Sequence, residues 1–272
     1  MKKKWEILPI RCASIEVKTK KTICIGKIYG STIFEQIKKG TEGHAYALYQ
    51  QMSDNTWQLN TTPQFGDYIP LDKTPLTHPS QPQEYESEET LYNDVKQYIF
   101  KHLDLVNPLG YDTLASFVFM TWIPELFDFT PYLGFYGREA VGKTRALETL
   151  NQLCFRAWLT TGLTTATLFR LTEKFQPTLL LDESEFLTAE DKKELIGLLN
   201  AGQRRGVFIP RMKEDSQEME FFNVYCPKAI AGTEELKRTT TSRMITFVMT
   251  KNIRPTPRRI DTTEGLKLRN QL

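Results

Sequence analysis

The sequence predicts an α/β protein in which helices flank a parallel sheet. Three apolar runs carry this prediction, and each ends in a glycine or in small polar or acidic residues: 132–136, 177–181 and 227–232. Short runs without polar alternation are typical of strands buried on both faces, as in parallel sheets. Segments with helical periodicity separate these runs, as the crossover connections of a parallel sheet require.

The first run leads into Gly137-Arg-Glu-Ala-Val-Gly142-Lys143-Thr144, and an amphipathic segment follows. Strand, loop and helix in this order match the P-loop pattern G-x-x-x-x-G-K-[ST]. The glycines allow a sharp turn and let backbone N–H groups close around phosphate oxygens, while the helix N-terminus favours the same anion. We therefore expect a P-loop NTPase core. Its candidate nucleotide-binding residues are Gly137, Arg138, Glu139, Ala140, Val141, Gly142, Lys143, Thr144 and Arg145.

The expected cofactors are ATP and Mg²⁺. Lys143 is placed to neutralise the β- and γ-phosphates, and the hydroxyl of Thr144 to bind Mg²⁺. The run 177–181 ends in Asp182 and Glu183, at the edge where ligands bind in open α/β sheets. We expect Asp182 to hold Mg²⁺ through water and Glu183 to orient or deprotonate the attacking water.

Composition bounds the class of protein. The 272 residues are enough for one α/β core and a small extra domain, and the formal net charge of +2 permits a nucleic-acid partner without requiring one. The four cysteines lie far apart, which argues against a zinc site or a disulfide framework and favours a reducing, cytoplasmic location. The longest apolar run, 114–127, contains Pro124 and Glu125 and is too short to span a bilayer, so no membrane partner is expected.

The segments before the core predict three further parts. Residues 1–70 read as a small β-rich module, with a hairpin over 14–29, a short helix over 33–38 and a second hairpin over 46–59. Its lysines at 18, 20 and 21 fit either a nucleic-acid contact or a solvated turn. Residues 71–86 are rich in proline, serine and glutamine and read as a linker.

Residues 87–130 predict a helical preface to the core. Ser87 is a candidate N-cap, and one apolar face is expected to combine Leu91, Val95, Ile99 and Phe100. A second helix is expected over 111–126. The core itself covers 131–250, with further helices over 164–175 and 189–199 and a short strand within 154–160.

A hairpin is expected from strands over 207–212 and 219–224, before the third buried strand. Four basic residues lie in or near it: Arg204, Arg205, Arg211 and Lys213. In a ring of copies, such a projection would line the central hole and hold a phosphate backbone without reading sequence. An ordinary surface hairpin, or arginines that serve the neighbouring subunit's nucleotide, fits the same residues.

Two residues further along complete the candidate catalytic set with Glu183. Thr233 follows the third buried strand, where it would sense the γ-phosphate or hold the attacking water, unless it is a plain strand-end residue. Arg243 precedes a β-like run and suits an arginine finger that acts on the adjacent subunit's ATP. A surface arginine at a strand entry is the alternative.

These motifs, in this order, resemble those of AAA+ ATPases, and Ser242-Arg243 is similar to the pair in clamp-loader subunits. The stretches 177–183, 200–206, 226–232 and 241–245 more closely resemble a family of P-loop ATPases in phage, plasmid and integrated-element replication proteins, often beside primase modules. The resemblance covers 87–249. It implies a DNA-linked, helicase-like ATPase that forms a homo-oligomeric, hexameric ring, with a hairpin as in superfamily-3 and minichromosome-maintenance helicases and a primase or other replication protein as partner.

One departure from the AAA+ pattern concerns the C-terminus. Residues 251–272 form a Pro/Arg-rich tail, with Pro255, Pro257, Arg258 and Arg259, that is too short for the helical lid of most AAA+ proteins. The same motifs therefore also fit a loader or adaptor that is not a motor, in which ATP controls binding to a partner protein and the β-rich module docks that partner.

Overall fold

The computed structural model describes residues 15–17, 20–23, 27–29, 32–38, 44–53, 57–60, 68–70, 75–81, 83–161, 164–182, 189–212, 218–233 and 238–272. The chain divides into two compact units. One comprises Met1–Thr74 with His78–Pro82, and the other Pro75–Thr77 with Gln83–Leu272.

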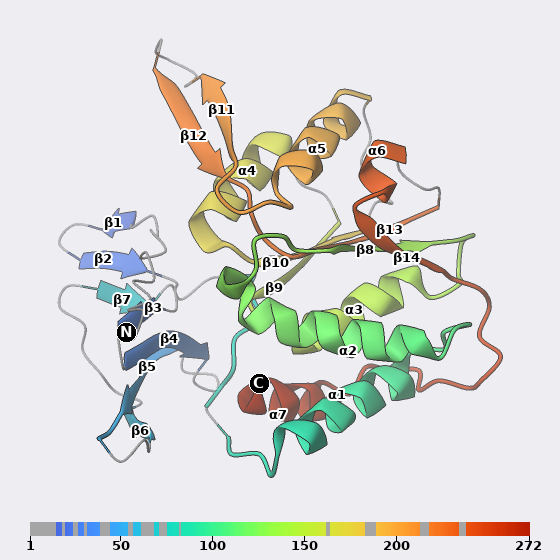
Figure 1. Cartoon of the computed structure of the whole chain (residues 1–272), viewed down its shortest axis with the longest axis horizontal. Coiled ribbons are helices and arrows are strands. Elements are labelled where there is room, and N and C mark those ends of the chain that lie inside the picture. Colours follow the sequence, from blue (N-terminus) through green and yellow to red (C-terminus); the bar gives the residue numbers. More distant parts are fainter. Residues whose placement is uncertain are drawn as a thin grey trace, which may run out of the picture. The chain divides into compact units, whose positions relative to one another are not determined.

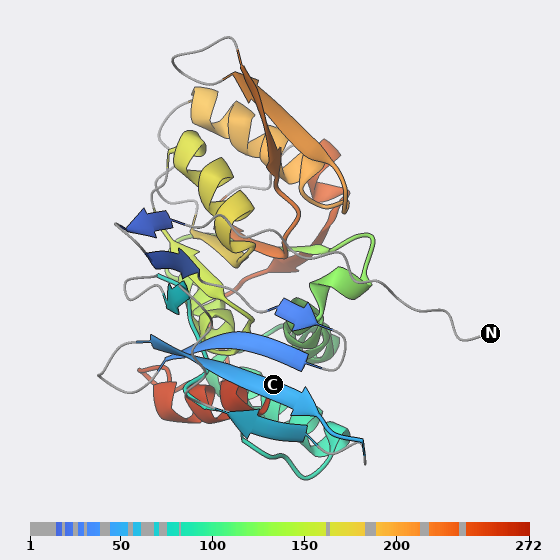
Figure 2. The same cartoon turned by 90° about the vertical axis from the view of Figure 1, so that its left-hand side faces the viewer.

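The first unit contains two small sheets, drawn in blue to cyan in Figure 2. Strands β1 (Ile15–Val17), β2 (Lys20–Ile23) and β7 (Tyr68–Pro70) form one sheet. Strands β3 (Lys27–Tyr29), β4 (Thr32–Lys38), β5 (His44–Gln51) and β6 (Trp57–Asn60) form an antiparallel second sheet. The antiparallel pair β5–β6 confirms the second predicted hairpin. The first is confirmed only over β1 and β2, because residues 27–29 form β3 and pair with β4 in the other sheet.

The predicted helix over 33–38 is wrong, because these residues belong to β4. This strand pairs with β3 on one edge and β5 on the other. β-Branched residues at 32, 33 and 37 favour a strand. Pairing on both edges also satisfies more backbone hydrogen-bonding groups than a six-residue isolated helix could, because so short a helix forms few internal hydrogen bonds.

The second unit confirms the α/β fold class, with a five-stranded parallel sheet flanked by helices (Figure 1). The strand order is β14 (Met244–Val248), β8 (Tyr132–Tyr136), β13 (Lys228–Gly232), β10 (Thr178–Asp182), β9 (Ala157–Thr160). The chain leaves β8 for the far edge at β9 and later crosses back to β14 on the other side of β8. Ligands bind beyond the carboxyl ends of the strands at such a switch point.

Two hydrophobic clusters cover the two faces of this sheet. The first packs Leu133, Phe135 and Leu180 against α1 (Glu88–His102), α2 (Leu109–Trp122), α3 (Lys143–Leu153) and α7 (Thr262–Gln271). The second packs Tyr132, Leu179, Leu181 and Ile230 against α4 (Thr165–Phe175) and α5 (Ala189–Ala201). Burial on both faces explains why these strands are continuous apolar runs.

The helical preface follows the prediction with two corrections. Ser87 caps α1 by accepting a hydrogen bond from the Thr90 N–H, and Leu91, Val95 and Ile99 are buried. Phe100 is not part of that face, since it is 40% exposed. The second helix ends at Trp122, and the 3-10 turn η1 (Pro124–Leu126) follows, because Pro124 cannot continue an α-helix.

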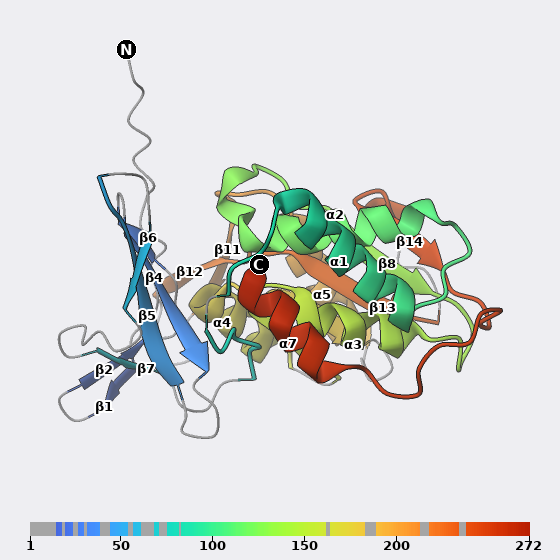
Figure 3. The same cartoon turned by 90° about the horizontal axis from the view of Figure 1, so that it is seen from below.

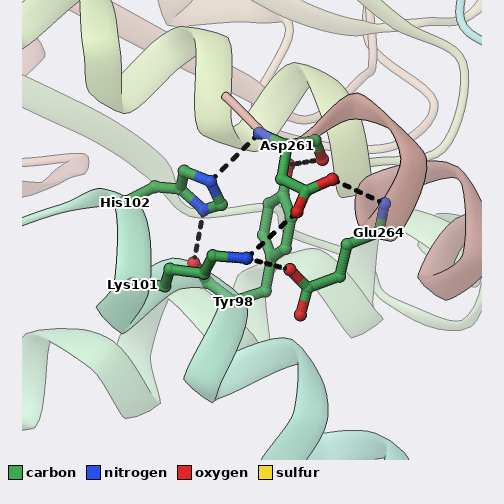
Figure 4. A network of polar contacts seen from close by, with 5 residues as sticks. All are labelled: Tyr98, Lys101, His102, Asp261 and Glu264. Carbon is green, nitrogen blue, oxygen red and sulfur yellow. Dashed lines mark hydrogen bonds and ion pairs between the residues drawn. The ribbon is translucent and has the colours of Figure 1, made fainter. Parts of the chain in front are cut away.

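The C-terminal segment contains a helix, α7, that the sequence did not predict. It lies beside α1 and α3 (Figure 3). Asp261 caps it by accepting from the Glu264 N–H. A polar network joins this helix start to α1, in which Lys101 pairs with Asp261 at 3.0 Å and Glu264 at 2.6 Å (Figure 4).

Candidate nucleotide-binding site

The P-loop connects β8 to α3 at the carboxyl edge of the sheet. A Cβ atom on Gly137 would lie 2.4 Å from the backbone oxygen of Met249, so only glycine fits where the strand turns. Gly142 caps α3 with a φ of 90°, a left-handed conformation that glycine adopts without strain. Around them, Arg138, Glu139 and Ala140 are exposed and Val141 is buried.

Lys143, the first residue of α3, lies over this loop. Its ammonium donates hydrogen bonds to the carbonyl oxygens of Gly137 at 2.8 Å and Arg138 at 2.7 Å. The positive charge is therefore held within the turn whose N–H groups are candidates for phosphate binding.

The structure brings the two candidate metal ligands together. The Thr144 hydroxyl donates to a carboxylate oxygen of Asp182 at 2.7 Å. Asp182 is 7% exposed and ends β10, so its carboxylate faces the loop from a fixed strand. A hydroxyl and a carboxylate are oxygen donors of the kind that Mg²⁺ prefers, and their chemistry fits that ion.

Thr233 lies at the same edge, directly after β13. In register, Gly232 pairs with Tyr136 of β8, and Ala231 pairs with Asp182 of β10. The Gly137 N–H also donates to Gly232 O at 3.4 Å. Thr233 is exposed and follows the strand that separates the P-loop strand from the Asp182 strand.

The side chain of Arg145, a predicted nucleotide contact, binds the C-terminal segment in this structure. Its guanidinium donates to the carbonyl oxygens of Pro257 and Arg258 in the C-terminal segment. These contacts hold the tail beside the first turn of α3. A hollow of about 500 Å³ lies there, lined by residues of α3, β9 and the tail, among them Arg145, Asn151, Arg258 and Arg259.

Two candidate site residues, Glu183 and Lys213, lie outside the described residues. Their predicted roles as base and as nucleic-acid contact stay predictions.

Arg243 lies at the amino-terminal ends of the strands, whereas the P-loop lies at their carboxyl-terminal ends. Arg243 precedes β14, whose first residue pairs with Tyr132, whereas the P-loop follows Tyr136. Five strand steps of about 3.3 Å each separate these two ends by roughly 16 Å along the strand direction. This exceeds the reach of an arginine side chain, so Arg243 does not reach the P-loop of its own chain.

The three described basic residues near the hairpin do not gather on it. Arg205 pairs with Asp128 at 2.7 Å, and the guanidinium of Arg204 lies 5.7 Å from the ring centroid of Phe129. Asp128 and Phe129 belong to the segment after η1. Arg211 is on β11 (Phe208–Met212), and its guanidinium lies 4.0 Å from the ring centroid of Phe169 in α4. These three arginines therefore do not form a single basic surface on the hairpin.

The hairpin of β11 and β12 (Met219–Asn223) instead presents an apolar outer face. Its exposed side chains alternate with packed ones, and Pro210 pairs with Phe221 and Met212 with Met219. Four large hydrophobic residues on it are more than half exposed: Phe208, Met212, Met219 and Phe221. Exposed apolar patches of this kind mark interaction surfaces.

Sequence reasoning missed the residues that hold Arg243 in place. The Gln203 side chain donates to the carbonyl oxygen of Arg243 at 3.2 Å, and the Tyr132 N–H donates to it at 3.3 Å. A lysine, Lys228, lies fully buried beside them. The one available signal was a lysine inside an otherwise apolar strand.

Comparisons with known proteins find structural similarity only. No family model matches the chain, and no curated protein does. The apo structure of the NrS-1 C-terminal region is similar with a TM-score of 0.42 and 11% identity, over 87% of this chain. The chain spans 64% of the length of that NrS-1 chain. A JCV helicase with a bound small molecule is similar with a TM-score of 0.34 and 16% identity, over 60% of this chain and 46% of that one.

Within the described residues, no helix combines the length and apolar character needed to cross a bilayer.

Proposed function

We propose that this protein is a Mg²⁺-dependent ATP hydrolase of helicase-like type, which acts on DNA in the replication of a mobile element such as a phage or plasmid. One observation carries the proposal: the Thr144 hydroxyl and the Asp182 carboxylate meet at 2.7 Å, beside a glycine loop over which Lys143 lies. This combination of anion cradle, cation and oxygen donors suits a magnesium-bound triphosphate.

In this proposal each residue has a defined task. Backbone N–H groups of 137–144 hold the phosphates, Lys143 neutralises them, and Thr144 and Asp182 hold the ion, Asp182 through water. Bound Mg²⁺ would supply charge stabilisation at the phosphoryl oxygens. Glu183 is the proposed base and Thr233 the proposed contact to the γ-phosphate or the attacking water.

We further propose that the protein works as a homo-oligomeric ring, a hexamer, in the cytoplasm. Arg243 lies too far from its own P-loop to act there, which favours action on the neighbour's ATP. DNA contact is proposed for the basic residues at 204, 205, 211 and 213, and a primase or another replication protein as a further partner.

The test is ATP hydrolysis with and without single- or double-stranded DNA. We expect DNA to raise turnover, and Lys143→Ala to abolish hydrolysis. Lys267→Ala on the exposed side of α7 is the matched control and should hydrolyse ATP normally. A folded wild-type protein that never retains ATP with Mg²⁺ would refute the whole proposal, whereas hydrolysis indifferent to DNA would refute only its nucleic-acid part.

A specific observation favours a second candidate, the nucleotide-controlled loader or adaptor. The outer face of the hairpin is apolar, which suits a protein partner better than a phosphate backbone. An assay for displacement of an annealed strand separates the two candidates. Displacement supports the motor, and nucleotide-dependent capture of a replication protein without displacement supports the adaptor.

A further inference from the structure

Lys228, the first residue of β13, is a charged side chain with 0% exposure. Its ammonium donates to the carbonyl oxygens of Val224 at 2.9 Å and Cys226 at 3.0 Å. The Gly202 carbonyl oxygen and the Tyr132 hydroxyl each lie at 3.5 Å. None of these four groups carries a charge, and burial lowers the pKa of the lysine. The Cys226 side chain also interacts with Lys228 and raises this pKa, but burial is the larger effect, and burial raises the pKa of the Cys226 thiol as well. A buried ammonium without an acidic side chain beside it is costly, so its contacts merit a functional explanation.

These contacts tie three chain segments together: the turn after α5, the segment between β12 and β13, and the start of β8. The turn approaches closely because residue 202 is a glycine. A Cβ there would lie 2.6 Å from the Lys228 ammonium and 2.3 Å from Val224 O. The Tyr132 hydroxyl in turn donates to Leu199 O at 3.0 Å, near the end of α5.

Two of the tied segments also hold Arg243. The carbonyl oxygen of Arg243 accepts from the Tyr132 N–H at 3.3 Å and from the side chain of Gln203 at 3.2 Å. Gln203 directly follows Gly202, and its own carbonyl accepts from the Thr130 N–H at 3.0 Å. The groups that locate the Arg243 backbone are thus adjacent in the chain to groups that Lys228 contacts.

We propose that Lys228 is a positioning residue for Arg243. Its buried ammonium holds the Gly202–Gln203 turn against the start of β8, and so fixes the arginine that completes the neighbouring subunit's site. This inference rests on the proposed action of Arg243 on a neighbour. It makes a directional prediction, because the P-loop, Thr144 and Asp182 lie at the other edge of the sheet. A chain without the ammonium should supply Arg243 poorly but keep a usable nucleotide site of its own.

The experiment compares Lys228→Met chains alone and in mixed assemblies. Alone, they should bind ATP with a KM within about twofold of wild type and lose kcat by on the order of 100-fold, the scale of a misplaced catalytic group. Mixing with Lys143→Ala chains, which bind no ATP but carry a placed Arg243, should restore part of the hydrolysis. Mixing with Arg243→Ala chains should restore none, because neither chain then supplies a placed arginine.

The control mixture of Arg243→Ala with Lys143→Ala separates this inference from the proposed function. If that mixture recovers no hydrolysis although both chains fold and assemble, the action of Arg243 on a neighbour is refuted. If it recovers hydrolysis but the Lys228→Met and Lys143→Ala mixture does not, the positioning role is refuted. Wild-type kcat in Lys228→Met alone refutes it as well.

A second variant covers the case in which Lys228→Met does not fold. Gln203→Ala leaves Lys228 in place and removes one of the two hydrogen bonds to the Arg243 carbonyl. The same pattern is expected, with rescue by Lys143→Ala and none by Arg243→Ala. Rescue by both partners, or by neither, would overturn the proposal.

Discussion

The P-loop shows how single residues set the geometry of the site. Gly137 is fixed by space, because the backbone of Met249 lies where a side chain would begin. Gly142 is fixed by its left-handed conformation. Gly197 in α5 has neither constraint, since nothing lies within 4 Å of its missing Cβ. These glycines should therefore respond in opposite ways to the same substitution.

Gly137→Ala should destabilise the protein by about 1–3 kcal/mol, the range for strain at a packed site. Gly197→Ala should stabilise it by about 0.5–1 kcal/mol, because alanine is the better helix former and its methyl group meets open space. Urea unfolding of both variants measures the two free energies. Equal signs would contradict the packing at one of the two positions.

The pair Thr144 and Asp182 predicts a specific metal dependence. Asp182→Asn should raise the Mg²⁺ concentration needed for half-maximal hydrolysis by about 10–100-fold, the effect typical of a lost outer-shell group. Thr144→Val should act in the same direction, whereas Thr144→Ser keeps the hydroxyl and should resemble wild type. A Mg²⁺ titration at saturating ATP checks this. Unchanged titrations in both the Asn and Val variants would mean that these groups do not hold the ion.

At the scale of elements, the hairpin has two faces that differ in packing. Phe222 is 9% exposed, and its ring lies 6.2 Å from that of Phe169 in α4. The adjacent Phe221 is 62% exposed on the outer face. The inner face anchors the hairpin to the core, which leaves the outer face available for a partner.

Phe222→Ala should cost about 3–5 kcal/mol of folding free energy, as for other buried aromatic residues. Phe221→Ala should change it by no more than about 0.5 kcal/mol. Thermal and urea unfolding provide the comparison. A large loss of stability in Phe221→Ala would show that the outer face is buried in the folded protein, for example between copies, and a dilution series would then reveal a concentration-dependent Tm.

The contact between His102 of α1 and the start of α7 predicts that folding stability depends on pH. The buried His102 accepts the Asp261 N–H at its Nε2 atom (3.1 Å), so its Nδ1–H donates to Tyr98 O at 2.9 Å, and burial lowers its pKa (Figure 4). The unfolded chain therefore takes up a proton at higher pH than the folded one. This contribution to stability is complete above about pH 6.5 and falls as the pH drops towards the lower folded pKa, by about 1.4 kcal/mol per unit of difference.

Urea unfolding at pH 7.5 and 5.5 measures this loss in wild type and in His102→Gln. The variant should be less stable at pH 7.5 but lose less stability between the two pH values. Contributions of groups shared by both proteins cancel in the comparison. Lys101 and Asp261 stay charged throughout, because their pKa values are raised and lowered, respectively, away from this range. Equal losses in the two proteins would exclude His102 as the source.

For the whole molecule, prediction from sequence succeeded where chemistry and burial are local. The P-loop strand and the Asp182 strand are buried on both faces, so their apolar runs identify them, and their polar ends meet because the strands are parallel. Helix α7 in the tail was not predicted, because it is stabilised by partners distant in sequence such as Lys101 and Tyr98 of α1. The side-chain partners of Arg205 and Arg211 could not be predicted for the same reason, since Asp128 and Phe169 are remote in sequence.

The separation of Arg243 from its own P-loop predicts how activity depends on assembly. Hydrolysis per chain should rise with protein concentration through the range in which copies associate, because in the proposed mechanism each site receives its arginine from another chain. Affinity for ATP should change little, since the P-loop, Thr144 and Asp182 belong to one chain. An arginine finger contributes on the order of 10³–10⁵ in rate, so the rise should be large in wild type and absent in Arg243→Ala. Turnover and sedimentation velocity across the same dilution series measure both quantities. Constant turnover per chain from a demonstrated monomer to a demonstrated oligomer would mean that each chain completes its own site.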